Sequence, residues 1–473
     1  LDAFNAGGNQ GADDRTSAVG LEVIDSVTVQ IGQHMLKSGG RFESTGQDSV
    51  SRAGFGGTFL FGADKDRDAS GAPILDGAGG PVYISPIENY RRTLLGMPGY
   101  GPSQFSIVSG EPRVGISQWN AGWFVTDFWA ASKRLSLSYG VRQELQNNLK
   151  ARLNLAPRAH LSWLFDEAGT SSVKAGAGVF YENVDQDLTL RVKRLDGARQ
   201  RQLIVPTPAF FPNVPVTVAS AIAIEPTLYA KSDDLRMPHW IRTSVSYERQ
   251  LPWKLWAVVD YLHERGVNLL RSRNINALLP GAATLARSPL FQYESTGRAS
   301  AHELQLTLTG NIGRNSVSAT YKLARRRGDT DGASSLPADP NDLSADYGPL
   351  GSDRRHDFVA STSFAIPGGF YVIPSLTVAS GRPFNITTGR DSNNDNVFTD
   401  RPGFAKPGDL NAIATPYGLL NPNPRPGDPM IPRNLGRDPW QTGVNLSVIK
   451  SLPRAMTITI DAENLLNQTR FAD

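Results

Sequence analysis

The 473-residue chain contains no cysteine, which excludes disulfide scaffolds, cysteine-ligated zinc, iron–sulfur clusters and cysteine nucleophiles together. Its six histidines are too scattered along the sequence for metal-ligand spacing. An excess of one charge is also missing, because 48 Lys and Arg residues against 45 Asp and Glu residues leave a net charge of +3. Nucleic-acid binding needs clustered positive charge, so we expect no nucleic-acid partner.

Enzyme motifs and membrane helices are also lacking. The sequence has no Gly-x-x-x-x-Gly-Lys, no His-Glu-x-x-His and no Gly-x-Ser-x-Gly. Ser-x-x-Lys occurs at Ser171 and Ser447, but both copies lie in alternating strand sequence, whereas in penicillin-binding enzymes this motif opens a helix. We therefore predict that the chain is not an enzyme. The uncharged stretches 203–224 and 359–381 are interrupted by prolines at a density that a membrane helix does not tolerate.

Glycine, proline and a two-residue periodicity dominate instead. The chain has 46 Gly and 32 Pro, which favours many turns. Between residues 134 and 144, Leu135, Leu137, Tyr139 and Val141 alternate with polar residues, which is typical of a strand with one apolar and one polar face. The same alternation recurs in segments 173–181, 241–247, 255–261, 303–309, 317–323, 444–448 and 456–461. We count about sixteen to eighteen such segments, many about ten residues long or more, where a globular strand has about five or six.

The length of these strands and the pattern of their connections predict the architecture. A transmembrane strand needs about 9–11 residues, which strands of a sandwich or propeller do not reach. Short turns at 251–252, 310–314 and 367–369 alternate with long polar runs at 325–353 and 388–439. Aromatic residues lie near predicted strand ends, as in the girdles of membrane barrels. We predict an all-β fold, a large antiparallel transmembrane β-barrel over residues 1–473, located in the outer membrane in contact with its lipid and lipopolysaccharide.

Several segments carry a family resemblance, in this order along the chain. They are residues 156–158 (APR), 178–181 (GVFY), 244–253 (SVSYERQLPW), 259–276, 347–358 (YGPLGSDRRHDF), 380–384 (SGRPF) and 461–471 (DAENLLNQTRF). These segments resemble the barrel of Oar-like TonB-dependent outer-membrane receptors. The resemblance implies about twenty-two strands for closure, of which this chain shows about sixteen to eighteen. The barrel is therefore expected to be incomplete.

The resemblance also implies a function. Receptors of this type take up a large or scarce solute when the TonB complex acts on a plug domain. Residues 1–473 show no signal peptide, plug or coupling box, so we expect TonB to act through a missing N-terminal plug region, and the solute is unknown. The alternative is an outer-membrane surface adhesion or structural barrel without transport. The long Asn-, Asp-, Gly- and Pro-rich loops are compatible with both functions.

A basic cluster lies between residues 191 and 201, with two open interpretations. Arg191, Lys193, Arg194, Arg199 and Arg201 could attract an anionic solute or lipopolysaccharide phosphate. A solvated loop explains the same charges.

The sharpest local signal for a metal is an Asx-rich loop. Asp391, Asn393 and Asp395 match positions 1, 3 and 5 of a calcium loop, and Asp400 could close the site. The glycine and glutamate of an EF-hand are missing, and Asx-rich runs also form plain turns. The resemblance adds that Oar-like receptors often have such a loop before an Arg-Pro pair, as at residues 401–402. We predict a calcium loop of Asp391, Asn393, Asp395 and Asp400, and no other cofactor.

Overall fold

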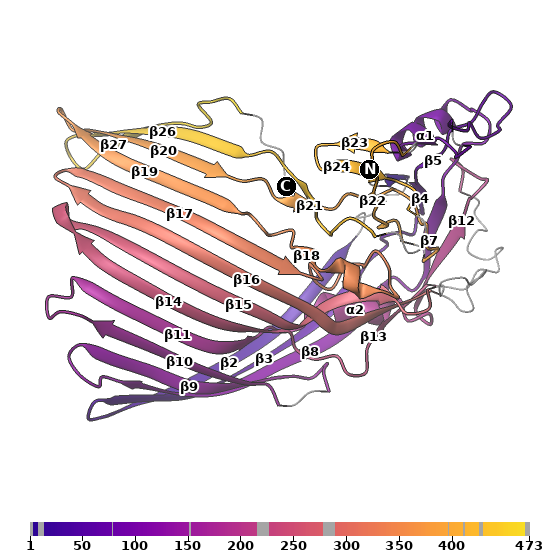
Figure 1. Cartoon of the computed structure of the whole chain (residues 1–473). Coiled ribbons are helices and arrows are strands. Elements are labelled where there is room, and N and C mark those ends of the chain that lie inside the picture. The colour runs from indigo at the N-terminus through magenta and orange to yellow at the C-terminus, as the bar shows by residue number, and fades with distance from the viewer. Residues whose placement is uncertain are drawn as a thin grey trace.

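The computed structural model describes residues 3–7, 14–77, 79–150, 153–214, 227–277, 289–395, 397–409, 412–424 and 429–468. Within these residues the main element is a sheet of sixteen strands, of which fourteen form one continuous hydrogen-bonded path. We call these fourteen strands the wall (Figure 1). In order across the sheet they are β2 (Arg15–Ile31), β3 (His34–Val50), β8 (Arg113–Trp129), β9 (Leu135–Gln146), β10 (Leu155–Leu164), β11 (Ser171–Tyr181), β14 (His239–Leu251), β15 (Leu255–Asn274), β16 (Leu290–Ile312), β17 (Asn315–Gly328), β19 (His356–Ile366), β20 (Phe370–Ala379), β26 (Gln441–Ser451) and β27 (Thr457–Ala462).

Every neighbouring pair in the wall is antiparallel, so the predicted all-β class, antiparallel sheet and strand number are confirmed. The two remaining strands of the sheet are short: β13 (Leu228–Lys231) pairs in parallel with β16, and β18 (Gly348–Pro349) pairs with β17. No helix of the described residues is long and apolar enough to cross a membrane.

The two faces of the wall differ as the sequence alternation predicts. Val259, Leu306 and Tyr321 lie opposite one another on β15, β16 and β17. The next position along each strand brings Asp260, Gln305 and Lys322 together on the other face. Val259 and Leu306 are each 41 % exposed, which a water-soluble sheet would avoid and a lipid-facing surface requires. The apolar face therefore points outward and the polar face lines the lumen.

Connections at the two rims of the wall differ in length. At one rim the turns are short, such as the 3₁₀ turn Pro252–Lys254 between β14 and β15 and the turn at Pro367–Gly369 between β19 and β20. The turn between β16 and β17 is narrower than the predicted 310–314, because the strands pair up to Ile312 and Asn315. At the other rim the chain makes long excursions before β8, β14, β19 and β26. This asymmetry is typical of outer-membrane barrels, whose long loops are extracellular.

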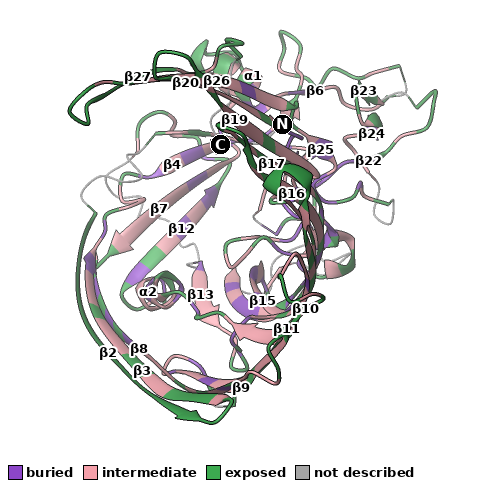
Figure 2. Cartoon of the chain, turned by 90° about the vertical axis from the view of Figure 1, so that its left-hand side faces the viewer, coloured by how far each residue is buried: buried purple, intermediate pink, exposed green. Residues whose placement is uncertain are grey.

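The long excursions fold into a second structural layer, which we call the loop-end assembly and define as the described residues within 51–112, 182–238, 329–355 and 380–440. A four-stranded sheet of β1 (Phe4–Ala6), β4 (Thr58–Phe61), β7 (Gln104–Gly110) and β12 (Gln200–Pro206) lies at this end. Figure 2 shows the wall curving around β12, β13 and the helix α2 (Gln186–Arg194). The other elements are α1 (Pro86–Leu94), a 3₁₀ turn (Leu343–Asp346), and the short strands β5 (Asp64–Lys65), β6 (Tyr83–Ile84), β21 (Pro383–Phe384), β22 (Gly403–Phe404), β23 (Ile413–Thr415), β24 (Gly418–Asn421) and β25 (Gly436–Arg437).

Candidate functional site

A cavity of about 790 Å³ lies between the loop end of the wall, the four-stranded sheet and α2. A volume of this size is in the range of small-molecule sites. Its lining comes from segments far apart in the sequence: Asn5, Gly7, Asp14, Thr16, Gln47, Ser49, Ser51, Ala53, Gly54, Thr58, Ser106, Val108, Asp187, Leu190, Arg191, Arg194, Leu195, Gln200 and Gln202.

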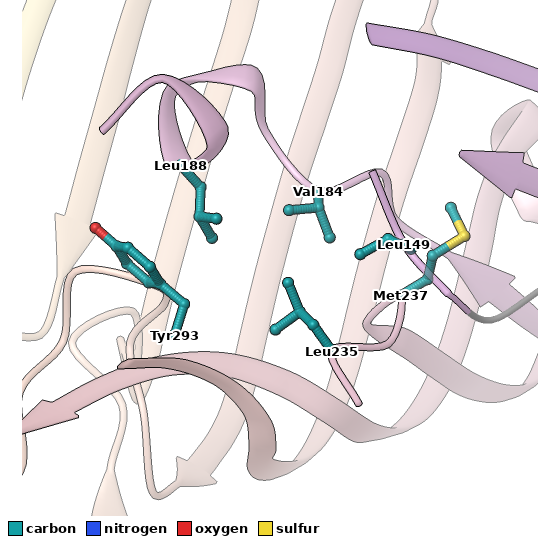
Figure 3. Packing of buried hydrophobic residues seen from close by; sticks show 6 residues of the cluster. All are labelled: Leu149, Val184, Leu188, Leu235, Met237 and Tyr293. Carbon is teal, nitrogen blue, oxygen red and sulfur yellow. The ribbon is translucent and has the colours of Figure 1, made fainter. Parts of the chain in front are cut away.

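Helix α2 forms one side of this cavity and is fixed to the wall by apolar packing. Its N-terminus is capped by Asp185, whose carboxylate accepts the backbone N–H of Asp187 at 3.1 Å. Leu188 is 5 % exposed and belongs to a buried cluster with Val184 and Tyr293 (Figure 3). On the neighbouring face, Leu190 packs with two buried residues at the loop end of β8. The helix is therefore anchored at two points inside the curve of the wall.

Buried hydrogen bonds fix the segment that precedes the helix. The Gln146 side chain donates to the Val184 carbonyl at 2.7 Å and accepts the Val184 N–H at 3.0 Å. Gln118 donates to the same carbonyl at 3.0 Å. All of these groups are buried, so losing one partner would leave a desolvated polar atom at a cost of about 1–3 kcal/mol. The position of α2 is thus specified by polar as well as apolar contacts.

The cavity lining is rich in neutral hydrogen-bonding side chains. Nine of the residues given above are Asn, Gln, Ser or Thr, and none is aromatic. The charged residues comprise two acidic and two basic ones, so the lining carries no net charge by formal count. Such a surface can bind a polar solute through many hydrogen bonds, whereas it offers neither stacking surfaces nor an excess of charge.

The basic cluster of the sequence analysis divides between this cavity and its surroundings. Arg191 and Arg194 line the cavity, and Arg199 pairs with Asp196 at 2.6 Å. Lys193 donates to the Gly115 carbonyl at 2.5 Å. Two members of the cluster thus line the cavity, whereas Arg199 and Arg201 are exposed and follow the helix. Sequence reasoning missed that this segment is a helix, although the Asp185 cap and the four-residue spacing of Leu188 and Val192 were signals for one.

Arg194 is the one cavity cation with an unsatisfied atom. Its Nη2 donates to the Ser49 hydroxyl at 3.0 Å, whereas its buried Nε has no hydrogen-bond partner within the described residues. Burial lowers the pKa of this guanidinium, with the carboxylates of Asp14 and Asp187 acting in the opposite direction. It remains charged at neutral pH because an arginine side chain titrates far above that range. Arg194 therefore places a positive charge at the cavity wall, while its Nε is covered by neighbouring atoms.

The predicted calcium loop forms a compact turn. The Asp395 N–H is accepted by Asp391 at 2.9 Å and by Asn393 at 3.1 Å, and Asp395 in turn accepts the Val397 N–H at 2.7 Å. Asp400 accepts the Ser392 N–H, which brings the fourth predicted residue to the same turn. The structure thus places all four predicted residues in one cluster, with contacts that an Asx turn makes.

Two carboxyl groups in this loop have perturbed acidities. Burial, and after it the charges of Asp391 and Asp400, raises the pKa of Asp395 to about 8. Burial also raises the pKa of Asp400 to about 6. Within the described residues, no group of three or more His, Asp or Glu side chains is arranged to hold a metal ion. The loop therefore has the donor chemistry of a cation site, in an arrangement held together by hydrogen bonds.

Comparison with known proteins agrees with the fold. The model of the outer membrane beta barrel domain family matches residues 2–154 and 148–473. No curated protein matches the sequence. Among solved structures, the outer membrane transporter YddB from Escherichia coli is similar with a TM-score of 0.57 and 12 % identity, over 96 % of this chain and 51 % of that one.

Two further solved structures have similar folds. A mutant of the ferric enterobactin receptor PfeA from Pseudomonas aeruginosa aligns with a TM-score of 0.54 and 12 % identity, over 96 % of this chain and 49 % of its own. The FrpB iron transporter from Neisseria meningitidis aligns with a TM-score of 0.51 and 10 % identity, over 96 % of this chain and 51 % of the transporter. The chain thus spans about half the length of these relatives, which are transporters and receptors rather than enzymes. With the family model covering nearly every residue, the chain belongs to the outer membrane beta barrel domain family and is an outer-membrane protein.

Proposed function

We propose that this chain is the barrel portion of an Oar-like TonB-dependent receptor that takes up a polar solute from outside the cell. The cavity at the long-loop rim is the observation that supports this function best, because it lies where a solute arrives and opens between wall and loops. The lumen below it is also polar: Lys174 and Glu248, on neighbouring strands, form an ion pair on the inner face. A polar path from the loops into the lumen suits solute passage.

The lining favours a particular class of solute. Nine neutral amide and hydroxyl side chains, no aromatic ring and balanced charges suit a solute with many hydrogen-bonding groups and little net charge, such as an oligosaccharide or a peptide. The similar receptors named above include a receptor for ferric enterobactin and an iron transporter. A highly charged iron chelate fits this lining less well, since it would need clustered opposite charge.

Uptake by living cells tests the proposal. Cells that carry or lack the gene are supplied with labelled neutral oligosaccharides, with labelled short peptides and with a ferric chelate, before and after the membrane is de-energised. We expect energy-dependent uptake of a neutral probe only in cells with the gene. If deletion leaves uptake of all probes unchanged and instead weakens attachment to surfaces, the adhesion or structural function is correct.

A matched pair of variants connects uptake to the cavity. Arg194→Gln removes the cavity guanidinium with the unsatisfied Nε, whereas Arg199→Gln removes a cation that is paired with Asp196 nearby. We expect the first change to weaken probe binding about tenfold, as for loss of a charge-assisted hydrogen bond, and the second to leave it unchanged. Equal effects of both changes would mean that the cavity is not the binding site.

We also propose that Asp391, Asn393, Asp395 and Asp400 bind calcium and thereby order the long loop before β26. The support is chemical: three carboxylates and an amide oxygen meet in one turn, and burial, together with the charges of Asp391 and Asp400, raises the pKa of Asp395 to about 8. Calcium would supply the positive charge that protons otherwise provide, with an affinity on the order of 10⁻⁴ to 10⁻³ M, as in extracellular modules.

Protease nicking within residues 388–402 tests the calcium proposal. A chelator should accelerate nicking of the wild-type protein and have no effect on the Asp391→Ala/Asp395→Ala variant, which cannot bind the ion. Asp409→Ala serves as a control, because this carboxylate lies in a separate turn where it accepts the Lys406 N–H. A wild-type nicking rate that does not respond to chelator would identify the loop as an Asx turn only.

A further inference from the structure

The outward face of the wall carries a set of arginines without counterions close to the long-loop rim. The register places Arg265, Ser300 and Arg327 side by side on β15, β16 and β17. Arg265 and Arg325 are exposed, and none of Arg265, Arg325 and Arg327 forms an ion pair with a described carboxylate. We call these three residues the outer arginine cluster.

Arginines on the inner face of the same region behave differently. Arg326, between two members of the cluster, pairs with Glu303 at 2.9 Å. Arg242 on β14 pairs with Glu264 at 2.6 Å. Asp329, two residues after Arg327, is already paired with the buried Arg271 at 2.6 Å and accepts the Arg298 N–H at 2.7 Å. The chain therefore provides counterions for these inner arginines and leaves those of the outer cluster unneutralised.

From the row of Arg265 and Arg327 toward the midplane, the rows change step by step from charged to apolar. Two residues toward the midplane, His263, His302 and Arg325 lie opposite one another, and the two imidazole rings stack at 4.6 Å. The next row contains Tyr261, Leu304 and Leu323, and the Tyr261 hydroxyl lies 2.9 Å from His302 Nδ1. Below it lies the apolar row of Val259, Leu306 and Tyr321.

Such a sequence of rows is complementary to an amphiphile with an anionic head. Adjacent strands are about 4.8 Å apart, so Arg265 and Arg327, with one strand between them, are about 10 Å apart at the backbone. Phosphate oxygens accept charge-assisted hydrogen bonds from guanidinium groups, and acyl chains pack on aliphatic side chains in the rows below. Arg327 is half-buried, with its guanidinium 5.2 Å from the Tyr347 ring centre and its Nε covered by neighbouring atoms, so it contributes mainly its positive charge to the cluster.

We propose that the outer arginine cluster is a binding site for a phosphorylated lipid of the outer leaflet, with its phosphates on Arg265, Arg325 and Arg327 and its acyl chains on the apolar rows beneath. This site is separate from the solute cavity, which lies on the lumen side and contains none of these residues. It does not depend on what the barrel transports. Bound lipid would fix the height of β15–β17 in the membrane.

The test uses the protein extracted from outer membranes in mild detergent, with bis-phosphorylated lipid A and dephosphorylated lipid A as probes. Native mass spectrometry measures the fraction of protein with bound lipid over a range of lipid and salt concentrations. The change Arg265→Gln/Arg325→Gln/Arg327→Gln should weaken lipid A binding by about fivefold per arginine, on the order of a hundredfold in all. Wild-type binding should also weaken as salt rises, because these charges are solvent-accessible.

The matched control removes three arginines from the opposite rim. Arg134, Arg314 and Arg454 are exposed at short turns, so their replacement by Gln changes net charge equally while leaving the cluster intact. We expect this variant to bind lipid A within twofold of wild type. The triple Arg→Lys variant of the cluster should keep most of the affinity, because point charges remain.

Several outcomes would overturn the proposal. One is equal lipid A binding by the wild-type protein and the Gln variant of the cluster. Another is equal affinity of the wild-type protein for phosphorylated and dephosphorylated lipid A. This comparison needs no variant, so it is valid even if the triple variant does not fold. Displacement of lipid A by an equimolar amount of inorganic phosphate would indicate a site for free anions and not for a lipid.

Discussion

In the wall many large apolar side chains are exposed, whereas in the loop-end assembly the most deeply buried side chains include charged ones. Val19 on β2 is 76 % exposed, as suits contact with lipid. In the loop-end assembly Arg401 is 1 % exposed and pairs with Asp346 at 3.0 Å, and Asp353 is fully buried. The wall is thus stabilised by its backbone ladder and by lipid, while the loop-end assembly has an interior like that of a water-soluble domain.

The comparison indicates where mutations act strongly. In lipid, strand hydrogen bonds are costly to break because no water replaces them. In the loop-end assembly, removing a single partner of a buried ion pair is costly, because the charge of the other partner stays desolvated. The following predictions are ordered from the largest expected effect to the smallest.

Asp353→Ala should destabilise the loop-end assembly by about 3–5 kcal/mol. This carboxylate accepts the Arg326 N–H at 2.6 Å and pairs with Arg437 at 2.6 Å, so it joins two long loops. Hydrogen exchange in residues 380–440 measures the loss, and the wall should be unaffected except near the Arg326 N–H on β17. Asp233→Ala is the control, because its pair with Lys150 is exposed and is worth at most about 1 kcal/mol. Equal protection in both variants would contradict the prediction.

Leu306→Arg should reduce the stability of the barrel in vesicles by about 2–4 kcal/mol, the cost of an arginine on a lipid-facing surface near the midplane. Gln305→Arg, at the neighbouring position, should be tolerated because its side chain enters the polar lumen. Urea titration of both variants in vesicles gives the comparison. If Gln305→Arg proved the more damaging change, the two faces would be assigned the wrong way round.

The loop around Asp395 should open more readily as pH rises when calcium is absent. An opened loop releases this proton near the ordinary pKa, whereas the closed loop retains it up to the raised pKa of about 8. The closed form therefore binds more protons than the open form between these pKa values, so it loses stability as pH increases. The ratio of closed to open loop should fall by up to about tenfold per pH unit, with no further fall above pH 8. Nicking rates of residues 388–402 from pH 5 to 9 measure this, and Asp395→Asn should abolish most of the dependence.

Ala455→Gly should stabilise the turn between β26 and β27 by about 1 kcal/mol. Arg454 and Ala455 have φ of 60° and 57°, a pair of left-handed residues that a tight hairpin turn needs and that glycine adopts without strain. The midpoint of urea unfolding in vesicles should increase slightly. Ala159→Gly, within β10, should have the opposite effect, since its backbone is extended and gains nothing from glycine.

The sequence alone determined the wall, and the reason is local. Alternation at Leu135, Leu137 and Tyr139 fixes which side of a strand meets lipid, and strand length separates a membrane sheet from a soluble one. Prolines and glycines at Pro252 and Pro367–Gly369 likewise marked the short turns where the structure has them. The clustering of Asp391, Asn393, Asp395 and Asp400 also follows from sequence spacing, although their role as calcium ligands stays a prediction.

Only the tertiary structure decided the sites. The cavity joins Gln47, Ser106, Arg194 and Gln202, and no pattern along the chain connects these residues. The outer arginine cluster depends on strand register, because Arg265 and Arg327 come together only by both lying opposite Ser300. Arg326 does not belong to the cluster, because successive side chains of a strand point to opposite faces. The alternation of neighbouring residues shows to which face of the sheet each side chain points. Strand pairing and loop folding depend instead on contacts between distant segments. The sequence does not encode those contacts in any periodic form.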